Sequence, residues 1–173
     1  MRIRRLPALL AALSLAAVAM PLTPAAAAEQ FPATFTIRPH TASRFCVNAP
    51  GAGNGSIVFL VECGGAWGAG TRTWTSRTVG GIGDLVTIRK RGTDQCLEVA
   101  GWSRHNGAAV MTWACGQQSN QYWRVSKDGA GWWLLKNENS GSCLDARVHE
   151  NWSSVYQWGC HGGAEQQWRV VPA

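Results

Sequence analysis

The sequence predicts an all-β fold in which three tandem repeats of about 47 residues share one core. Three observations support this prediction. Six cysteines fall into three pairs of similar spacing, and the same residue types recur at fixed distances from the second cysteine of each pair. Apolar residues also alternate over short stretches that are separated by turn residues, and no stretch of ten or more residues after position 28 has a helical period with caps.

Residues 1–28 have the pattern of a secretion signal peptide. A basic start is followed by a mainly apolar stretch from Leu6 to Met20, and a run of small residues ends at Ala28. We therefore expect residues 29–173 to form one secreted, extracellular domain with no membrane insertion, because no other apolar run is long enough to span a bilayer. An uncleaved N-terminal anchor is the alternative.

Composition and charge narrow the class of protein further. The chain has 173 residues, of which 46% are hydrophobic and 15% charged, which is typical of a globular protein and not of a disordered one. Without the three arginines of residues 1–28, the formal net charge falls from +6 to +3. Because no basic cluster is longer than residues 89–91, we expect no nucleic-acid partner.

The cysteines predict three local disulfides. An exported chain with an even number of cysteines meets an oxidising compartment, and the residues within each proposed pair are 17 or 19 positions apart, whereas the gaps between pairs are longer. Each bridge would add about 3 kcal/mol in the chain-entropy model. No C-x-x-C pair suggests a metal site, and we expect no metal and no cofactor. The proposed pairs are Cys46–Cys63, Cys96–Cys115 and Cys143–Cys160.

The repeats extend over residues 33–80, 81–128 and 129–173, approximately. Asn-Gly, Asp-Gly and Asn-Ser-Gly turns separate short alternating strands, so each repeat has about four strands and is too small to bury its apolar face alone. Three copies therefore predict a closed three-fold barrel. Aligned on the second cysteine of each pair, the recurring positions are Asn54, Asn106 and Asn151; Val58, Val110 and Val155; and Trp74, Trp123 and Trp168.

These motifs resemble the ricin-B-type lectins, also known as family-thirteen carbohydrate-binding modules. Their signature is a Q-x-W triplet that closes each repeat of a β-trefoil, and Gln121-Tyr122-Trp123 and Gln166-Gln167-Trp168 match it. The first copy, Arg72-Thr73-Trp74, keeps only the tryptophan. The resemblance covers roughly residues 33 to 173. It implies a β-trefoil in which Trp74, Trp123 and Trp168 pack in the core.

The same resemblance implies a shallow sugar pocket on each repeat. In similar proteins, an acidic residue two positions after the first cysteine accepts hydrogen bonds from sugar hydroxyls, and an aromatic residue two positions before the second cysteine stacks on the ring. Such sites bury little area, so repetition gains avidity on polymeric glycans. A polar pair just before the x-W of the triplet flanks the sugar. The acid, aromatic residue and polar pair are Asp145, Trp158 and Glu165 with Gln166 in the third repeat, and Glu98, Trp113 and Asn120 with Gln121 in the second.

The two sites depart from the family pattern in different ways. Glu165 stands where the family more often has Asn, so it accepts but cannot donate, and it adds like-charge repulsion beside Asp145. Glu98 carries one methylene more than the usual Asp, which leaves open whether the second repeat binds. The first repeat has Asn48, Val61 and Arg72 at the corresponding positions, so we expect it to bind no sugar.

We therefore expect a secreted lectin for galactose-type or xylan-type glycans, with sites on the second and third repeats and an oligomeric state that the sequence leaves open. Trp113 and Trp158 lie at an odd offset from Val110 and Val155, which predicts that their side chains face outward. The alternative function is that of a protease inhibitor or a protein-interaction module on the same fold.

An enzyme is not expected. The paired carboxylates of a glycoside hydrolase would be Asp145 and Glu165, but both are expected at a rim open to water, where nothing raises a pKa. The four histidines share no repeat position or motif, so we expect them to be solvated loop residues.

Overall fold

The computed structural model describes residues 30–147 and 149–173, and the predicted signal peptide lies outside these residues. Strands and short 3-10 helices make up the regular structure. The first repeat contains β1 (Thr34–Pro39), β2 (Phe45–Asn48), β3 (Ser56–Ile57), β4 (Phe59–Glu62) and β5 (Trp74–Val79). The second contains β6 (Ile82–Lys90), β7 (Gln95–Val99), β8 (Val110–Ala114) and β9 (Tyr122–Lys127). The third contains β10 (Trp133–Asn137), β11 (Cys143–Asp145), β12 (Tyr156–Trp158) and β13 (Trp168–Pro172).

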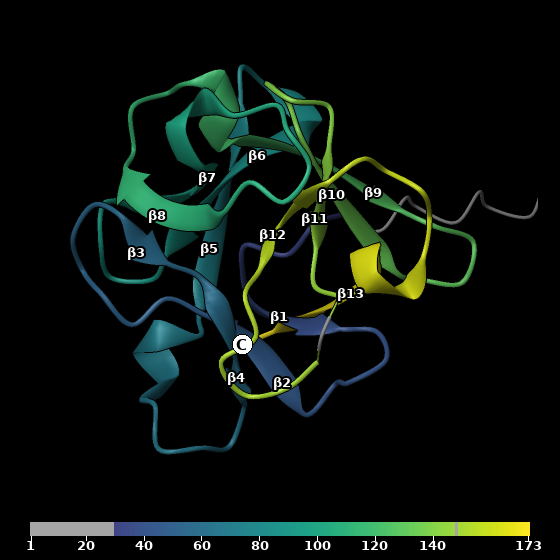
Figure 1. Ribbon diagram of the computed structural model, residues 1–173. Helices are drawn as coiled ribbons and strands as arrows, with labels where there is room; N and C mark the ends of the chain where they lie inside the picture. Colours follow the sequence, from purple (N-terminus) through teal and green to yellow (C-terminus); the bar gives the residue numbers. More distant parts are fainter. Residues whose placement is uncertain (1–29, 148) are drawn as a thin grey trace, which may run out of the picture.

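The first and last strands of each repeat form a closed barrel. Antiparallel pairs run from β1 to β5, β6, β9, β10 and β13, and β13 pairs with β1 again. Closure leaves the barrel without an edge that could pair with another chain. The inner strands pair as β2 with β4, β7 with β8 and β11 with β12, one hairpin for each repeat (Figure 1). This is the β-trefoil that the sequence predicts.

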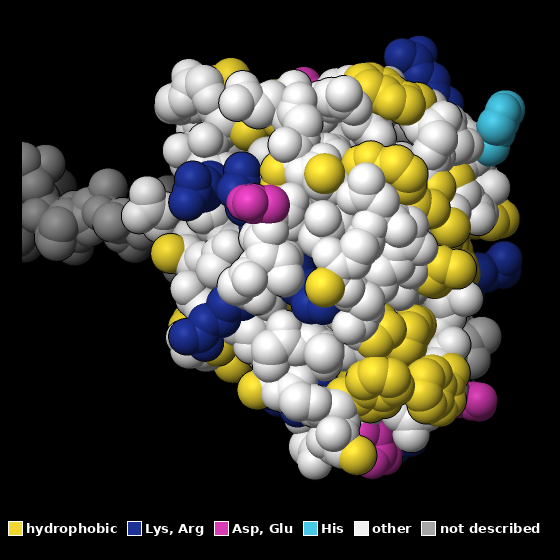
Figure 2. Space-filling model, turned by 90° about the vertical axis from the view of Figure 1, so that its left-hand side faces the viewer, with side chains coloured by type: hydrophobic (Ala, Val, Ile, Leu, Met, Phe, Trp, Pro, Cys, Tyr) yellow, Lys and Arg dark blue, Asp and Glu magenta, His cyan; other side chains and the backbone are white. Residues whose placement is uncertain are grey.

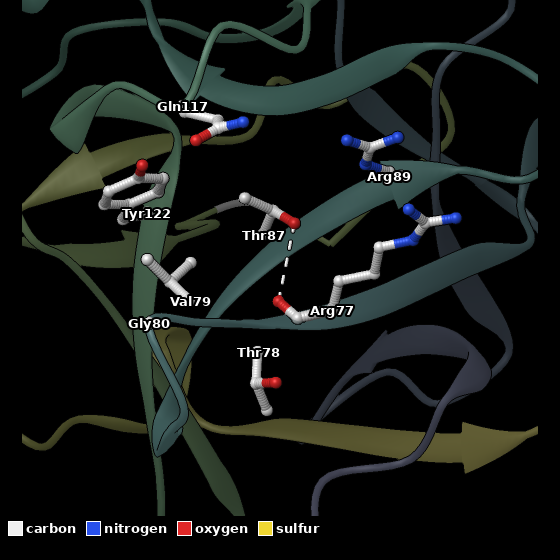
Figure 3. A pocket seen from close by; sticks show the side chains of 8 residues that line it. All are labelled: Arg77, Thr78, Val79, Gly80, Thr87, Arg89, Gln117 and Tyr122. Carbon is white, nitrogen blue, oxygen red and sulfur yellow. Dashed lines mark hydrogen bonds between the residues drawn. The ribbon is translucent and has the colours of Figure 1, made fainter.

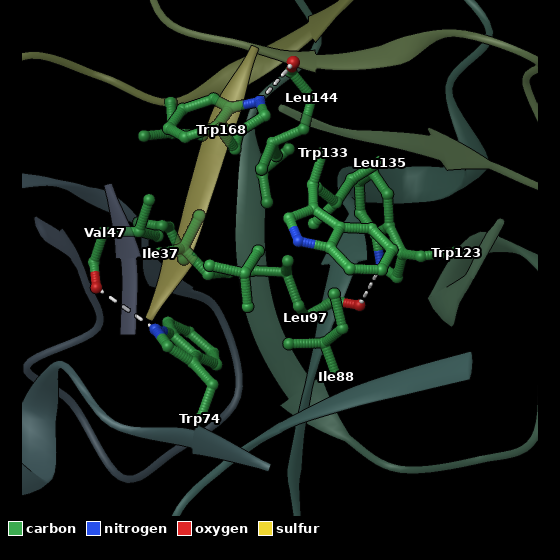
Figure 4. Close-up of a cluster of buried hydrophobic side chains, with 14 of the residues drawn as sticks. Ile37, Val47, Trp74, Ile88, Leu97, Trp123, Trp133, Leu135, Leu144 and Trp168 are labelled. Atoms are coloured by element: carbon green, nitrogen blue, oxygen red, sulfur yellow. Dashed lines mark hydrogen bonds between the residues drawn. The ribbon is translucent and has the colours of Figure 1, made fainter. Parts of the chain in front are cut away.

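Each repeat contributes one tryptophan, near the start of its last strand, to the inside of the barrel. Trp74, Trp123 and Trp168 are completely buried, which confirms their predicted core role. Each indole N–H donates to a backbone carbonyl of the same repeat, so none of these three buried donors is left unpaired (Figure 4). The acceptors are the carbonyls of Val47, Leu97 and Leu144, at 3.1, 2.9 and 3.1 Å.

The recurring asparagines connect neighbouring repeats in a ring. Each side-chain oxygen accepts the backbone N–H of the residue that directly precedes the second cysteine of the next repeat, and the third repeat connects back to the first. The three hydrogen-bonded pairs are Asn54 with Ala114, Asn106 with Gly159 and Asn151 with Glu62, at 2.7, 2.8 and 3.0 Å.

The three predicted disulfides are confirmed, with S–S distances of 2.03, 2.06 and 2.02 Å.

Four 3-10 helices complete the regular structure of the described residues. They are η1 (Ala69–Thr71), η2 (Ala100–Trp102), η3 (Ser119–Gln121) and η4 (Ala164–Gln166). No helix among the described residues is long and apolar enough to cross a membrane.

Replacing Trp168 by Phe should lower the free energy of unfolding by about 3 kcal/mol. The change leaves a cavity in the core and removes the donor to the Leu144 carbonyl. The matched control is Trp113→Phe, because Trp113 is 43% exposed and the same substitution there should cost less than about 0.5 kcal/mol. Urea denaturation with the disulfides intact measures both values, and equal losses would contradict the structural role of Trp168.

Candidate functional site

A small cavity on the third repeat contains the predicted acid and the predicted aromatic residue. It has a volume of about 130 Å³ and lies between the β11–β12 hairpin and the segment that follows Cys160. Asp145 pairs with Tyr156 in the antiparallel hairpin, and Trp158 is two residues further along β12, so the acid and Trp158 are diagonal neighbours on one face of the hairpin. The lining residues are Asp145, Arg147, Trp158, His161 and Glu165.

Asp145 is held mainly through the Oδ2 atom of its carboxylate. The residue is completely buried, and Oδ2 accepts a hydrogen bond of 2.9 Å from Nε2 of Gln166. His161 Nε2 lies 3.6 Å from the same oxygen. Oδ1 is buried and has no hydrogen-bond partner among the described residues, which is costly unless a bound group donates to it.

Burial raises the pKa of Asp145 above its ordinary value of 3.8. The hydrogen bond from Gln166, the charge of His161 and the nearby Tyr156 hydroxyl lower the pKa in part, and Glu165 contributes a smaller increase by like-charge repulsion. The expectation that no acid in the site has a raised pKa is therefore wrong for Asp145. The prediction of repulsion from Glu165 is confirmed, but desolvation is the larger cause.

Gln166 acts beneath the pocket. Its side chain is completely buried, and Nε2 donates to Asp145 and to the Gly159 carbonyl, at 2.9 and 3.0 Å. Its Oε1 accepts the backbone N–H of His161 at 2.9 Å. Because both N–H groups are used, Gln166 positions the acid and the loop, and it has no free donor for a ligand.

The wall of the cavity is aromatic and cationic. Trp158 is half-buried, and the guanidinium of Arg147 lies 5.2 Å from the centre of its ring, which is the geometry of a cation–π contact. Glu165 is also half-buried at the rim. The sequence pattern pointed to Trp158 and Glu165 but not to Arg147 or His161, which lie outside the recurring positions.

The second repeat has a larger pocket of about 400 Å³. Three of the residues assigned to this site, Glu98, Trp113 and Asn120, line it together, whereas Gln121 does not. Trp102, Met111, Gln118 and Gly101 line it as well. Trp102 is 48% exposed; it was not assigned to the site because it lies in a turn-rich segment, where the sequence does not distinguish a binding surface from a residue that caps the barrel.

The second repeat repeats the hydrogen bonding of the third. Gln121 Nε2 donates to Glu98 Oε2 at 2.8 Å, and burial raises the pKa of Glu98 while hydrogen bonds from Gln121 and Asn120 lower it in part. The acid of each pocket is thus buried and held by the Gln of its Q-x-W triplet. The remaining contacts are Gln121 Nε2 to the Ala114 carbonyl at 3.0 Å and the Gly116 N–H to Gln121 Oε1 at 2.8 Å.

The first repeat lacks this arrangement. Val61 is buried where the other repeats have an outward tryptophan, and both polar atoms of the buried Asn48 side chain have no partner among the described residues. Arg72 hydrogen-bonds to the Trp67 carbonyl and not to Asn48. The absence of a sugar site on this repeat stays a prediction.

An exposed aromatic cluster covers part of the first repeat. Trp152, from the third repeat, stacks on Phe59 at 5.2 Å between ring centres and meets Trp67 edge-on at 5.4 Å. Trp152 has a φ of +73°, whereas glycines with φ of +79° and +80° occupy the corresponding positions of the first two repeats. In the view of Figure 2, hydrophobic side chains gather along the right-hand side of the molecule.

The histidines differ from the expectation that all are solvated loop residues. His161 faces Asp145, and His40 stacks on Trp132 with 3.8 Å between ring centres and is hydrogen-bonded to Gln167. Residues 30–147 and 149–173 contain no group of three or more His, Cys, Asp or Glu side chains that could hold a metal ion.

Comparison with solved structures supports the fold. The designed three-fold symmetric protein ThreeFoil aligns with a TM-score of 0.74 and 22% identity over 81% of this chain and 99% of its own. The Polyporus squamosus lectin, solved with a human-type influenza-binding epitope, gives a TM-score of 0.71 and 17% identity over 83% of this chain and 50% of its own. An exo-β-1,3-galactanase from Clostridium thermocellum gives 0.73 and 19% over 82% of this chain and 30% of its own.

Family models give a more specific result than these distant structures. None of the curated protein sequences compared with the chain matches it. The model of the ricin-type β-trefoil lectin domain matches residues 33–168, which is most of the chain. With three Trp-centred repeats around one barrel and an acid held by Gln in two of them, the chain belongs to the ricin-type β-trefoil lectin family.

Proposed function

We propose that the protein is a secreted carbohydrate-binding lectin that recognises glycans of galactose or xylan type through the pockets of its second and third repeats. The observation that carries this proposal is the unpaired, buried Oδ1 of Asp145 beside Trp158. A sugar hydroxyl that donates to Oδ1 would satisfy this oxygen, and a buried acceptor without a donor is otherwise unfavourable.

The third repeat offers the other contacts that a sugar ring needs. Trp158 supplies an apolar surface for one face of the ring, and Arg147 and Glu165 supply a donor and an acceptor at the rim. The cavity of about 130 Å³ is below the roughly 300 Å³ at which most small-molecule sites begin. It therefore suits one edge of a terminal or side-chain sugar, and affinity for a polymer would come from several weak contacts.

The second repeat is proposed as the broader site. Trp102 and Trp113 are both about half exposed and line one pocket with the acid, so two aromatic surfaces are available there. The longer Glu98 side chain is nevertheless hydrogen-bonded by Gln121 in the same way as Asp145 by Gln166. This shared contact supports binding by the second repeat in spite of the extra methylene.

Galactose-type ligands are supported by two of the structural neighbours. The Polyporus squamosus lectin is described in complex with Neu5Acα2-6Galβ1-4GlcNAc, and the Clostridium thermocellum protein is an exo-β-1,3-galactanase. Both are less than 20% identical to this chain, so xylan-type ligands stay in the proposal.

We do not propose an enzyme. Glu165 and Asp145 line the same cavity of about 130 Å³, which is smaller than most small-molecule sites. A purified protein that releases reducing sugars from galactan or xylan would contradict this part of the proposal.

Replacing Trp158 or Trp113 by Ala should weaken binding to a galactan or xylan at least tenfold, because each change removes the stacking surface of one pocket. Affinity electrophoresis and titration calorimetry with a panel of galactosides and soluble xylans measure the effect. Trp152→Ala is the matched control, since Trp152 is 62% exposed but lines neither pocket.

If the parent protein binds a glycan and the combined Trp113→Ala, Trp158→Ala variant binds it equally well, the assignment of the two sites is wrong. If a correctly folded protein bound no glycan of the panel, the lectin proposal would be wrong. A protein partner or a protease would then be the ligand to test, as expected for the alternative function.

Binding by the third repeat should weaken on acidification, at a pH above the ordinary carboxyl value of 3.8, because burial raises the pKa of Asp145 and a protonated carboxyl accepts fewer hydroxyl hydrogen bonds. The raised pKa also means that Asp145 stabilises the fold below pH 3.8 and loses this contribution as the pH rises through its folded-state pKa. Calorimetric titrations in a Trp113→Ala background isolate this site.

The isosteric Asp145→Asn variant should bind weakly and lack this dependence on pH. Because His161 and Glu165 also face Asp145, the His161→Gln and Glu165→Gln variants are measured beside it. A pH profile that is the same for Asp145→Asn and for the parent protein would show that another group titrates.

A further inference from the structure

A third polar pocket lies outside the two sugar pockets. It has a volume of about 260 Å³ and is formed by the β5–β6 hairpin, the segment after Cys115 and the start of β9 (Figure 3). Two of its lining residues are arginines and none is acidic. The lining residues are Arg77, Thr78, Val79, Gly80, Thr87, Arg89, Gln117 and Tyr122.

Strand pairing brings the two arginines to one side of this pocket. Arg77 is paired with Thr87, and Arg89 is two residues further along β6, so the arginines are diagonal neighbours on the same face of the hairpin. Figure 3 shows both guanidinium groups on the same side of the pocket, opposite Tyr122. Two cations on neighbouring positions of one face repel each other, and an anion bound between them would offset this repulsion.

The structure provides little compensation for these charges. Arg77 is exposed and has no ion-pair partner among the described residues, and Arg89 has only Asp94, whose side chain is 95% exposed, at 3.6 Å. An ion pair so open to water contributes little. Arg89 Nε is also buried without a hydrogen-bond partner among the described residues, so one donor near the pocket is left unused.

The opposite side of the pocket adds neutral polar groups. The Tyr122 hydroxyl and the Gln117 amide both line it, and Gln117 has a φ of +54°, a left-handed conformation that is unfavourable for residues other than glycine. The Thr87 hydroxyl is not free, since it donates to the Arg77 carbonyl at 3.5 Å. Two cations with neutral hydrogen-bonding groups suit a carboxylate or a sulfate better than a neutral sugar edge.

The pocket is adjacent to the sugar pocket of the second repeat. Gln117 lines the arginine pocket, and the next residue, Gln118, lines the sugar pocket. Strand register leads to the same conclusion, because Arg89 pairs with Cys96, which pairs with Trp113. Two strand spacings separate Arg89 from Trp113, a Cα distance of roughly 10 Å.

We propose that Arg77 and Arg89 form an anion subsite for the carboxylate or sulfate of an acidic glycan whose neutral part occupies the second-repeat pocket. This inference rests on the proposed lectin function and specifies its substrate class: the protein prefers uronate-bearing or sulfated polysaccharides to their neutral counterparts. A carboxylate and a sulfate are recognised in the same way here, because the oxygens of both anions accept hydrogen bonds from guanidinium N–H groups.

The test compares matched neutral and acidic polymers. Unsubstituted xylan is paired with glucuronoxylan, and galactan with sulfated galactan, and binding is measured by calorimetry at 0.15 M salt. Arg77→Gln should weaken binding to the acidic member of the preferred pair about tenfold and change binding to the neutral member less than twofold. Arg91→Gln is the control for general charge, because Arg91 is exposed, equally charged and outside the pocket.

A second measurement uses the unpaired donor directly. The Arg89 Nε–H resonance should shift when a glucuronic-acid-substituted xylo-oligosaccharide or a sulfated galacto-oligosaccharide is added, and not with the unsubstituted oligosaccharides. A shift with the glucuronic-acid ligand alone would identify the bound group as a carboxylate, and a shift with the sulfated ligand alone would identify it as a sulfate.

The outcomes separate this inference from the proposed function. Equal affinity for neutral and acidic polymers, or equal losses in Arg77→Gln and Arg91→Gln, would overturn the anion subsite and leave the lectin function in place. Binding of neither polymer in either pair would contradict the lectin function itself, and the subsite with it.

Discussion

The Q-x-W triplet joins the core of this protein to its surface pockets, and the rest of the structure depends on that connection. In the third repeat, the Trp168 indole donates to the carbonyl of Leu144, and Gln166 donates to the side chain of the next residue, Asp145. One triplet thus fixes both the backbone and the carboxylate of the acid. Because these hydrogen bonds are buried, breaking them is costly, and they therefore hold Asp145 in a fixed position.

Comparison of the repeats indicates which half of this connection is general. All three repeats retain the buried tryptophan, its hydrogen bond and the asparagine contact to the next repeat, so the barrel keeps its symmetry. The first repeat has lost the Gln, the acid and the outward tryptophan together, and aromatic residues from two repeats cover its surface instead. The symmetry therefore belongs to the barrel, whereas an acid held by Gln is found in two of the three repeats.

The sequence predicted the features that repeat and missed those that do not. Cysteine spacing and alternation predicted the disulfides and the barrel, because both patterns recur in every repeat, and the resemblance carried by the Q-x-W triplet implied the acid–aromatic pairs. Residue spacing did not predict that Trp102 lines the pocket beside Glu98 or that His161 faces Asp145, because turns without a period determine these positions. The raised pKa of Asp145 was also missed, since burial depends on which other segments cover the strand end.

The coupling of Gln166 to Asp145 can be measured most directly by a double-mutant cycle on glycan affinity, using Asp145→Asn, Gln166→Ala and the combined variant in a Trp113→Ala background. If Gln166 acts by positioning the acid, each single change should weaken binding at least tenfold, and the combined variant should bind no more weakly than Asp145→Asn. Losses that add independently, or a Gln166→Ala variant that binds as tightly as the parent, would contradict the connection between the Q-x-W triplet and the sugar site.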